Sequence, residues 1–337
     1  MRVSAIIPAF NCARYLPDAI RSVLDQSRGV HELIVVDDGS TDNTGDVVRG
    51  FSRVTYVRTP NQGAAAARNV GLARATGDLV AFLDADDAWY PNKLALQVEV
   101  LASHADVHAV CCDFSLVSED GTLREERHIR RKYRVFSAYG LDWPAMFPAR
   151  GTVASGGSSV NVYFGDAFAA LFRGNFVNTS SIVLRRDAIE RAGRFTVGRR
   201  TQEDYELWLK IALGGAMAYI DLPLLTFRRR PNQLTSDDQR LRVVQDTAEV
   251  VAALAGPARS RVGEAVVGER VADLYYTLAK ALLGSRQSSA ARSALGRAYA
   301  HSGFAPRVAS LYAWSWMPAS LGDGIRRGYK RMRQRAS

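Results

Sequence analysis

Cysteine is scarce in this sequence, with three residues among 337. Cys12, Cys111 and Cys112 include no pair with C-x-x-C spacing. Cys111 and Cys112 stand in an apolar segment that is typical of a buried strand. The pattern favours reduced thiols and a cytoplasmic protein.

Long apolar runs are absent as well. No stretch reaches the roughly 18 residues that a membrane-spanning helix needs. The apolar run at 3–7 is too short for a signal peptide and is itself the first expected strand. We therefore expect a soluble or peripheral protein.

Two common nucleotide-binding motifs are missing. The loop after the first expected strand reads Pro8-Ala9-Phe10-Asn11, without the G-x-G-x-x-G of a dinucleotide-dependent oxidoreductase. The chain also lacks the G-x-x-x-x-G-K of a P-loop kinase or NTPase. Both enzyme classes are set aside on this ground.

Positive charge, by contrast, is abundant. The formal net charge is +10 and the isoelectric point is about 9.7, while apolar residues make up 47% of the chain. This composition supplies a core and favours anionic partners such as phosphorylated substrates, an anionic membrane surface or nucleic acid. Because no nucleic-acid-binding module is present, we expect no nucleic-acid partner.

Strand-like and helical patterns alternate over about the first 116 residues, which predicts an α/β protein with a mostly parallel sheet flanked by helices. A helix follows each of the first four strands. The expected strands in this part are 3–7, 32–36, 54–57, 79–83 and 108–116.

The pattern changes after residue 117. Residues 118–160 read as an irregular segment, either functional or a tolerated surface insertion. Residues 237–337 read as helical, with a basic tail. Between them we expect a strand at 178–186, a helix from 203 and short strands at 216–220 and 224–227.

The segment Leu79–Asp87 has five apolar residues followed by three carboxylates. A buried strand would place these carboxylates at its carboxyl end, where open α/β sheets bind ligands. Asp84 and Asp86 would point the same way, since side chains alternate along an extended segment. Clustered carboxylates suit Mg²⁺ or Mn²⁺. The alternative is a solvated acidic turn.

Five motifs stand in a characteristic order along residues 1–235. They are Ile6-Ile7-Pro8-Ala9-Phe10-Asn11, Val35-Val36-Asp37-Asp38-Gly39-Ser40, Asn61-Gln62-Gly63 with Ala67-Arg68-Asn69, Asp84-Ala85-Asp86-Asp87, and Gln202-Glu203-Asp204.

This ordered set resembles the family 2 glycosyltransferases, bacterial inverting enzymes with the GT-A fold of nucleotide-diphospho-sugar transferases. The resemblance implies a GT-A domain at 1–236, with a nucleotide-sugar-binding half at 1–116. The acceptor half would span 117–236 and include the variable segment near 118–160.

The resemblance implies a nucleotide-diphosphate-sugar donor, with UDP-sugars as the default, and an acceptor hydroxyl. The implied donor-binding residues are Pro8, Ala9, Phe10, Asn11, Asp38, Gly63, Arg68, Asp84, Ala85 and Asp86. Asp38 would accept hydrogen bonds from base or ribose, or else cap the next helix. Gly63 would admit the donor or simply start a helix. Arg68 would pair with phosphate or with nearby acids.

Asp84 and Asp86 match the family's DxD motif. The resemblance implies that Asp86 contacts Mn²⁺ or Mg²⁺ directly, with Asp84 towards the ribose or the metal's waters and Asp87 as a third member. The metal would bridge the donor diphosphate and stabilise the leaving nucleotide.

Asp204 matches the general base of the family's ED motif, and Glu203 would orient the acceptor or the loop. The alternative for this pair is an acidic helix N-terminus. One departure concerns the basic residue and histidine that often follow the last strands. Here Phe227-Arg228-Arg229-Arg230 contains no histidine, so Arg228 or Arg230 would pair with the diphosphate instead.

We therefore expect an inverting, metal-dependent glycosyltransferase of cell-surface polysaccharide or glycolipid biosynthesis. The alternative is a catalytically degenerate nucleotide-sugar-binding or scaffold subunit. The aromatic segment Val308–Met317 and the basic residues of Gly324–Arg335 suit an anionic bilayer interface and a lipid-linked glycan acceptor at the inner face of the cell membrane. Alternatively the aromatics pack in a helical core and the tail is solvated.

Overall fold

The computed structural model describes residues 1–199, 201–230, 239–303 and 305–316. Contacts divide the chain into two compact units, 1–234 and 235–337, which are described separately. The expected domain boundary after residue 236 lies outside the described residues, as does the basic tail at 324–335.

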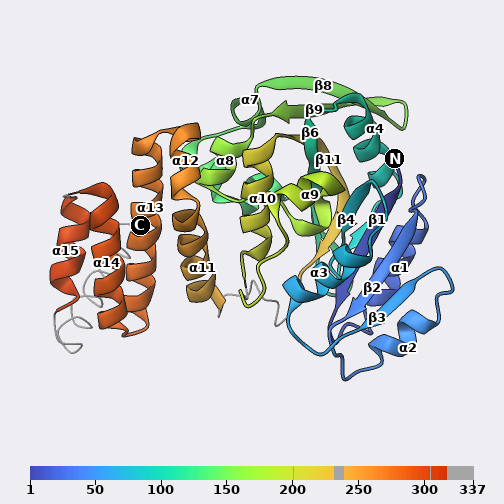
Figure 1. Ribbon diagram of the computed structural model, residues 1–337, viewed down its shortest axis with the longest axis horizontal. Helices are drawn as coiled ribbons and strands as arrows, with labels where there is room; N and C mark the ends of the chain where they lie inside the picture. The colour runs from blue at the N-terminus through green and yellow to red at the C-terminus, as the bar shows by residue number, and fades with distance from the viewer. Residues whose placement is uncertain (200, 231–238, 304, 317–337) are drawn as a thin grey trace. The chain divides into compact units, whose positions relative to one another are not determined.

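The first unit is built on one mixed sheet with helices around it (Figure 1). The strands are β1 (Val3–Ala9), β2 (Glu32–Asp37), β3 (Thr55–Arg58), β4 (Leu79–Phe82), β5 (Ala88–Trp89), β6 (Val107–Val117), β7 (Leu123–Glu125), β8 (Ala149–Ser155), β9 (Ser158–Gly165), β10 (Val183–Arg185) and β11 (Ala216–Arg228). The helices are α1 (Leu16–Leu24), α2 (Thr44–Arg49), α3 (Ala64–Arg74), α4 (Lys93–Ser103), α5 (Ile129–Lys132), α6 (Arg134–Tyr139), α7 (Trp143–Met146), α8 (Phe168–Arg173), the 3₁₀ helix η1 (Thr179–Ser181), α9 (Arg186–Ala192) and α10 (Glu203–Gly214).

The strand order is β3-β2-β1-β4-β10-β6-β11-β9-β8, with β5 paired to β11 and β7 to β6. β1 pairs in parallel with β2 and β4, and β6 pairs in parallel with β11. β10 is antiparallel to both of its neighbours. The expected α/β architecture with a mostly parallel sheet is confirmed.

Strand direction decides where the site forms. Because β1, β2, β4, β6 and β11 run the same way, their carboxyl ends meet at one edge of the sheet. β10 runs the opposite way, so the residues before it reach that same edge. The apolar runs in β1, β2 and β4 are almost fully buried, as parallel strands covered on both faces require.

Three expectations from the sequence are corrected. The segment 178–186 is no single strand, because the Asn178 side chain accepts a hydrogen bond from the Ser180 amide and starts η1. The two short strands at 216–220 and 224–227 form one strand, β11, with a register shift at Pro223. Residues 118–160 are not irregular throughout, since they contain β7, three short helices and the β8–β9 hairpin.

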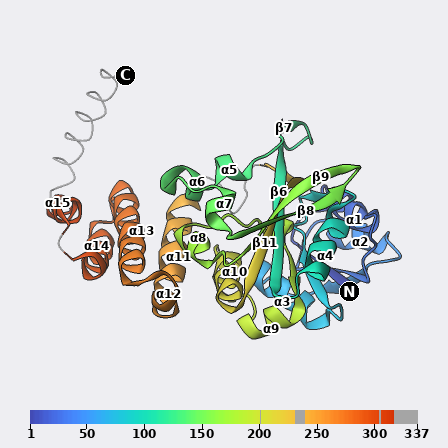
Figure 2. The ribbon, with the colours of Figure 1, turned by 90° about the horizontal axis from the view of Figure 1, so that it is seen from above.

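The second unit is helical, as expected. Its helices are α11 (Arg240–Ala253), α12 (Ala255–Val262), α13 (Glu264–Gly284), α14 (Ser288–Ser302) and α15 (Pro306–Trp314). α13 packs against α11, α12 and α14, and α14 also contacts α15 (Figure 2). The buried face of α13 has the spacing of an amphipathic helix, at Val267, Val271, Leu274, Leu278 and Leu282.

Candidate active site

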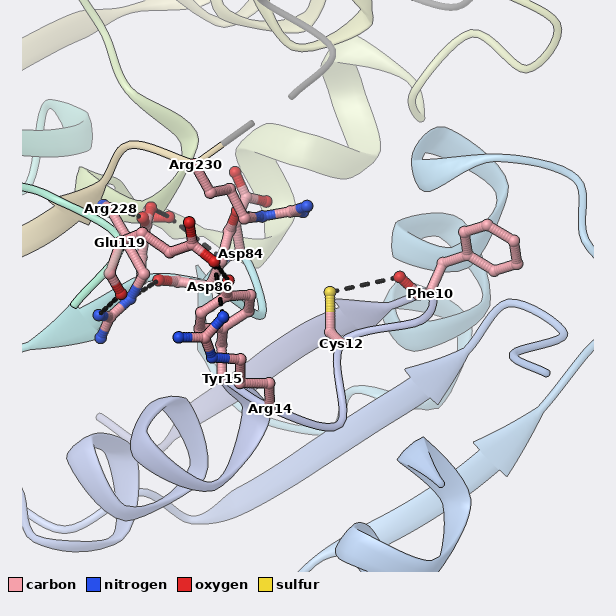
Figure 3. Close-up of polar contacts among 11 residues, drawn as sticks. Phe10, Cys12, Arg14, Tyr15, Asp84, Asp86, Glu119, Arg228 and Arg230 are labelled. Carbon is pink, nitrogen blue, oxygen red and sulfur yellow. Dashed lines mark hydrogen bonds and ion pairs between the residues drawn. The ribbon is translucent and has the colours of Figure 1, made fainter. Parts of the chain in front are cut away.

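The loop after β4 carries the DxD carboxylates, and each of the two faces an arginine. An Asp84 carboxylate oxygen accepts a hydrogen bond from Arg68 Nη2 at 2.8 Å. An Asp86 carboxylate oxygen accepts one from Arg230 Nε at 2.6 Å (Figure 3). The side chains of Asp84 and Asp86 are 32% and 13% exposed, while Ala85 between them is buried. The structure therefore brings both predicted carboxylates to the carboxyl edge of the sheet.

Asp87 has a different environment from its two neighbours. Its carboxylate accepts hydrogen bonds from the Ser180 hydroxyl at 2.6 Å and from the Arg228 amide at 3.1 Å. The residue is buried, and burial together with the charges of Asp86 and Asp84 raises its pKa. Both Asp87 oxygens thus bind a neighbouring hydroxyl or backbone amide, and the role of Asp87 as a third metal ligand stays a prediction.

The two candidate arginines after β11 also differ. Arg228 donates its backbone amide to Asp87, its Nε to the Asp86 carbonyl and one Nη to the Glu119 carbonyl. Arg230 binds the Asp86 carboxylate, and its side chain is 27% exposed. Arg228 thus fastens the loop, whereas Arg230 lies beside the carboxylate that the sequence assigns to the donor.

Arg68 links the two acidic motifs. Besides Asp84, it donates a hydrogen bond from Nη1 to a Glu203 carboxylate oxygen at 2.8 Å, and its side chain is 6% exposed. Burial alone would lower the pKa of Arg68, but the carboxylates of Asp84 and Glu203 outweigh it and raise that pKa. Of the two predicted roles for Arg68, the structure shows the pairing with acids.

Glu203 and Asp204 begin α10 and face different partners. Gln202, just before them, has a positive φ of 64° that turns the chain into the helix. Glu203 is buried, and burial raises the pKa of its carboxyl to about 7 although Arg68 opposes the rise. Asp204 is partly exposed, and its carboxylate accepts a hydrogen bond from the Thr179 hydroxyl at 2.8 Å. Asp204 is thus the accessible member of the pair.

The loop after β1 is held by polar contacts to the loop after β2. The Asn11 amide donates to the Ser40 hydroxyl, and the Asn11 side-chain oxygen accepts from the Thr41 amide. Phe10 is 46% exposed and its ring points away from Asp86, while Ala9 is buried and Pro8 partly so (Figure 3). Contact of Pro8, Ala9, Phe10 and Asn11 with the nucleotide stays a prediction.

Asp38 and Gly63 meet at the same edge. The Asp38 carboxylate accepts hydrogen bonds from the backbone amides of Gln62 at 2.9 Å and Gly63 at 2.7 Å. Asp38 is 4% exposed, and Gly63 precedes α3 with a positive φ of 92°. Asp38 thus holds the backbone of Gln62 and Gly63 just before α3. The hydrogen bond from base or ribose to Asp38 stays a prediction.

A group around Tyr15 was not predicted from the sequence. Glu119 accepts hydrogen bonds from Arg14 Nη1 at 2.6 Å and from the Tyr15 hydroxyl at 2.8 Å. The guanidinium groups of Arg228 and Arg230 lie 5.4 and 5.8 Å from the Tyr15 ring centroid (Figure 3). An open recess of about 350 Å³ is lined by Arg14, Ser118, Glu119 and Asp120. No sequence pattern predicts these contacts, which join the residues just before α1 to the loop after β6.

Ser180 and Thr179 are further residues that the sequence did not single out. The Ser180 hydroxyl donates to Asp87 and accepts from the Asp84 amide, so it holds the DxD loop from β10's side. The Thr179 hydroxyl donates a hydrogen bond to the Asp204 carboxylate. Two hydroxyl residues in η1 therefore join the two acidic motifs, although small polar residues carry no distinctive signal.

Grouped metal ligands and membrane-spanning helices are both absent from the described ranges. In 1–199, 201–230, 239–303 and 305–316, no three or more His, Cys, Asp or Glu side chains are grouped to hold a metal ion. Within the same ranges no helix is long and apolar enough to cross a membrane.

Comparison with known proteins places these observations in a family. The model described as glycosyl transferase family 2 matches residues 4–173, half of the chain. An uncharacterized glycosyltransferase of Nostoc sp., alr2836, is 49% identical over 105 residues, covering 30% of this chain and 33% of that protein. The Escherichia coli UDP-Glc:alpha-D-GlcNAc-diphosphoundecaprenol beta-1,3-glucosyltransferase WfgD is 42% identical over 102 residues, 29% of this chain and 40% of that protein. The matched segments thus span less than half of these two relatives.

Solved structures resemble nearly the whole chain. The S. aureus protein TarS 1–349 in complex with UDP-GlcNAc matches with a TM-score of 0.62 and 19% identity over 92% of this chain and 84% of that one. The mannosyltransferase PcManGT from Pyrobaculum calidifontis, in complex with GDP-Man and Mn²⁺, matches with a TM-score of 0.55 and 22% identity over 93% and 79%. At these identities the likeness concerns the fold, and the GT-A expectation is confirmed.

Proposed function

Because the chain belongs to glycosyl transferase family 2, we propose that it moves a sugar from a nucleotide-diphosphate-sugar to an acceptor hydroxyl, with inversion at the anomeric carbon. The observation that carries the proposal is the meeting of two accessible acidic groups at one sheet edge. Asp84 and Asp86 follow β4, Asp204 begins α10, and Arg68 with Ser180 and Thr179 connects them.

On the donor side, Arg230 would bind the diphosphate, and Asp86 would bind the cation that accompanies it. Both side chains are partly exposed and lie 2.6 Å apart. An Arg guanidinium binds phosphate oxygens through charge-assisted hydrogen bonds, so Arg230 would turn from Asp86 to the donor. Arg228, whose groups hold the loop, is the weaker of the two candidates for that contact.

The carboxylates of Asp84 and Asp86 fit a divalent cation. They supply hard oxygen ligands, and each already faces a positive charge in this structure. When bound, Mn²⁺ or Mg²⁺ would neutralise the charge that develops on the leaving nucleotide. In the related fold of PcManGT, GDP-Man and Mn²⁺ are bound together.

On the acceptor side, Asp204 would take the proton of the attacking hydroxyl. Its carboxylate is partly exposed and is oriented by Thr179. The buried Glu203 is bound to Arg68 and would hold the start of α10 without touching the acceptor. We therefore propose base catalysis for Asp204 and a positioning role for Glu203.

The named relatives suggest the process. WfgD is named for a glucosyl transfer to a diphosphoundecaprenol-linked sugar. We therefore propose that this chain acts in cell-surface polysaccharide or glycolipid assembly, on a lipid-linked glycan, at the inner face of the cell membrane.

A panel of UDP-, GDP- and dTDP-sugars with Mn²⁺ or Mg²⁺ tests the proposal. We expect one donor to release its nucleotide in a metal-dependent reaction that a suitable acceptor accelerates. Thermal shifts with that donor in the absence of any nucleotide release would support a binding or scaffold subunit instead.

A further inference from the structure

The net positive charge of the chain lies in its last 64 residues. Residues 274–337 contain eleven Lys and Arg and a single acidic residue, Asp323. Residues 1–273 contain 33 basic and 33 acidic residues, so they contribute no net charge. An anionic partner would therefore be attracted to the C-terminal end of the chain and not to the chain as a whole.

Exposed aromatic side chains lie in the described part of this basic end. Tyr312 is 42% exposed and Trp316 is 64% exposed, whereas Val308 and Leu311 of the same segment are buried. Neither α14 nor α15 contains an Asp or Glu. The segment from α14 to Trp316 thus combines exposed rings with Arg292, Arg297 and Arg307, of which Arg307 pairs with Asp273 of α13 at 3.8 Å.

An arginine holds the exposed tryptophan in place. The Arg292 guanidinium lies 4.1 Å from the Trp316 ring centroid and donates a hydrogen bond to the Ser315 carbonyl at 3.0 Å. The Tyr312 and Trp316 rings meet edge to face at 6.4 Å. We call Arg292, Tyr312 and Trp316 the aromatic–basic surface.

We propose that the aromatic–basic surface, together with the basic residues after it, docks on an anionic phospholipid bilayer. Trp and Tyr favour the headgroup level of a membrane, and nearby Lys and Arg are attracted to anionic lipids. Nucleic acid is the competing polyanion; because the sequence contains no nucleic-acid-binding module, the bilayer is the favoured partner and DNA binding is an outcome of the test. The proposal rests on the proposed function only for its purpose, which is to bring the enzyme to a lipid-linked acceptor.

Vesicle flotation of the full chain tests this surface. We expect the protein to float with phosphatidylcholine vesicles that contain about 30% phosphatidylglycerol, and to stay at the bottom with phosphatidylcholine alone. Raising the salt from about 0.05 M to about 0.5 M should release it, because the Debye length shortens. A protein that does not float with anionic vesicles at low salt would overturn the proposal, and so would equal flotation with neutral ones.

Variants then locate the contact. Tyr312→Ala with Trp316→Ala should lower the bound fraction at limiting lipid at least about fivefold, as should replacing the six basic residues of 326–335 with Gln. The second variant leaves α15 unchanged, so it serves where the first disturbs folding. Leu123→Ala, which removes another exposed apolar side chain, and Arg242→Gln, which removes an exposed basic side chain on α11, are the matched controls.

Two outcomes of this series are decisive. Unchanged flotation of both surface variants would overturn the proposal, and so would binding to DNA without binding to vesicles. Release of nucleotide from the donor is measured on the same samples. We expect this release to be unaffected, so that failed docking and failed catalysis are distinguishable.

Discussion

The loop Asp84–Asp87 and the helix start Glu203–Asp204 bring carboxylates from distant parts of the chain to one sheet edge. Each segment contains one buried carboxylate, Asp87 or Glu203, next to more accessible ones. The buried members differ in their partners, because Asp87 binds a hydroxyl and a backbone amide while Glu203 binds the cation Arg68. Neighbours in sequence thus acquire different roles from the groups that the fold places opposite them.

The largest effect is expected for Asp86→Asn. Loss of the carboxylate charge should abolish transfer by weakening metal-assisted donor binding. Calorimetry of donor plus Mn²⁺ measures the affinity directly, with the exposed Asp106→Asn as a control. Wild-type donor affinity together with wild-type activity would remove Asp86 from the metal site.

Asp204→Asn is expected to separate binding from turnover. Donor affinity should survive, while kcat falls by roughly 10²–10⁴-fold because the general base is lost. Single-turnover kinetics at saturating donor measure this change. Near wild-type turnover in a folded variant would show that Asp204 is not the base.

Arg68→Met removes the cation that Asp84 and Glu203 share. Since a buried carboxylate is left without its partner, we expect a loss of about 3–5 kcal/mol in the free energy of unfolding. Urea denaturation measures it, with the surface variant Arg74→Met as the matched control on α3. Equal stability of the two variants would contradict the bridging role.

Glu203→Gln is expected to change the pH dependence of stability. Burial raises the pKa of Glu203 to about 7, so between roughly pH 4.5 and 7 the native state holds a proton that the unfolded state has lost. The wild type should therefore lose stability relative to the variant as the pH rises through this window. Denaturation midpoints at several pH values measure the difference, and parallel curves would count against the raised pKa.

The smallest effect is expected for Asp87→Asn. An Asn side-chain oxygen can still accept the hydrogen bond from the Arg228 amide, and the Asn amide group can donate to the Ser180 hydroxyl in place of the other bond. Donor affinity and metal response should stay within about threefold of the wild type, well below the tenfold that 1.4 kcal/mol would produce. Loss of metal-dependent binding comparable to Asp86→Asn would instead support Asp87 as a metal ligand.

Much of the fold could be predicted because its signals are local. The buried runs of β1, β2 and β4 and the helices between them are visible as hydrophobic patterns, and their parallel order follows from the alternation. The structure of 149–165 could not be predicted, because a Gly- and Ser-rich hairpin has a weak apolar pattern and pairs through its backbone.

For the site, the acidic motifs could be predicted, but the different environments of the carboxylates within each motif could not. The resemblance picks out Asp84, Asp86 and Asp204 because they match the family's motifs in order. The tethering of Asp87 by Ser180, and of Glu203 by Arg68, depends on contacts between residues 93 and 135 positions apart. Local sequence patterns do not indicate which side chains so far apart in the chain will be in contact.

Arg68 has one consequence for how the enzyme would respond to ligands. Its rigid guanidinium plane holds Asp84 with one nitrogen and Glu203 with the other, so a shift towards either carboxylate lengthens the bond to the other. Donor binding would then shift the first turn of α10 and change the affinity for the acceptor. By thermodynamic reciprocity, acceptor binding would change the affinity for the donor by the same factor. Substitutions at Asp84 and Glu203 should accordingly be non-additive, although the two side chains are joined only through a third.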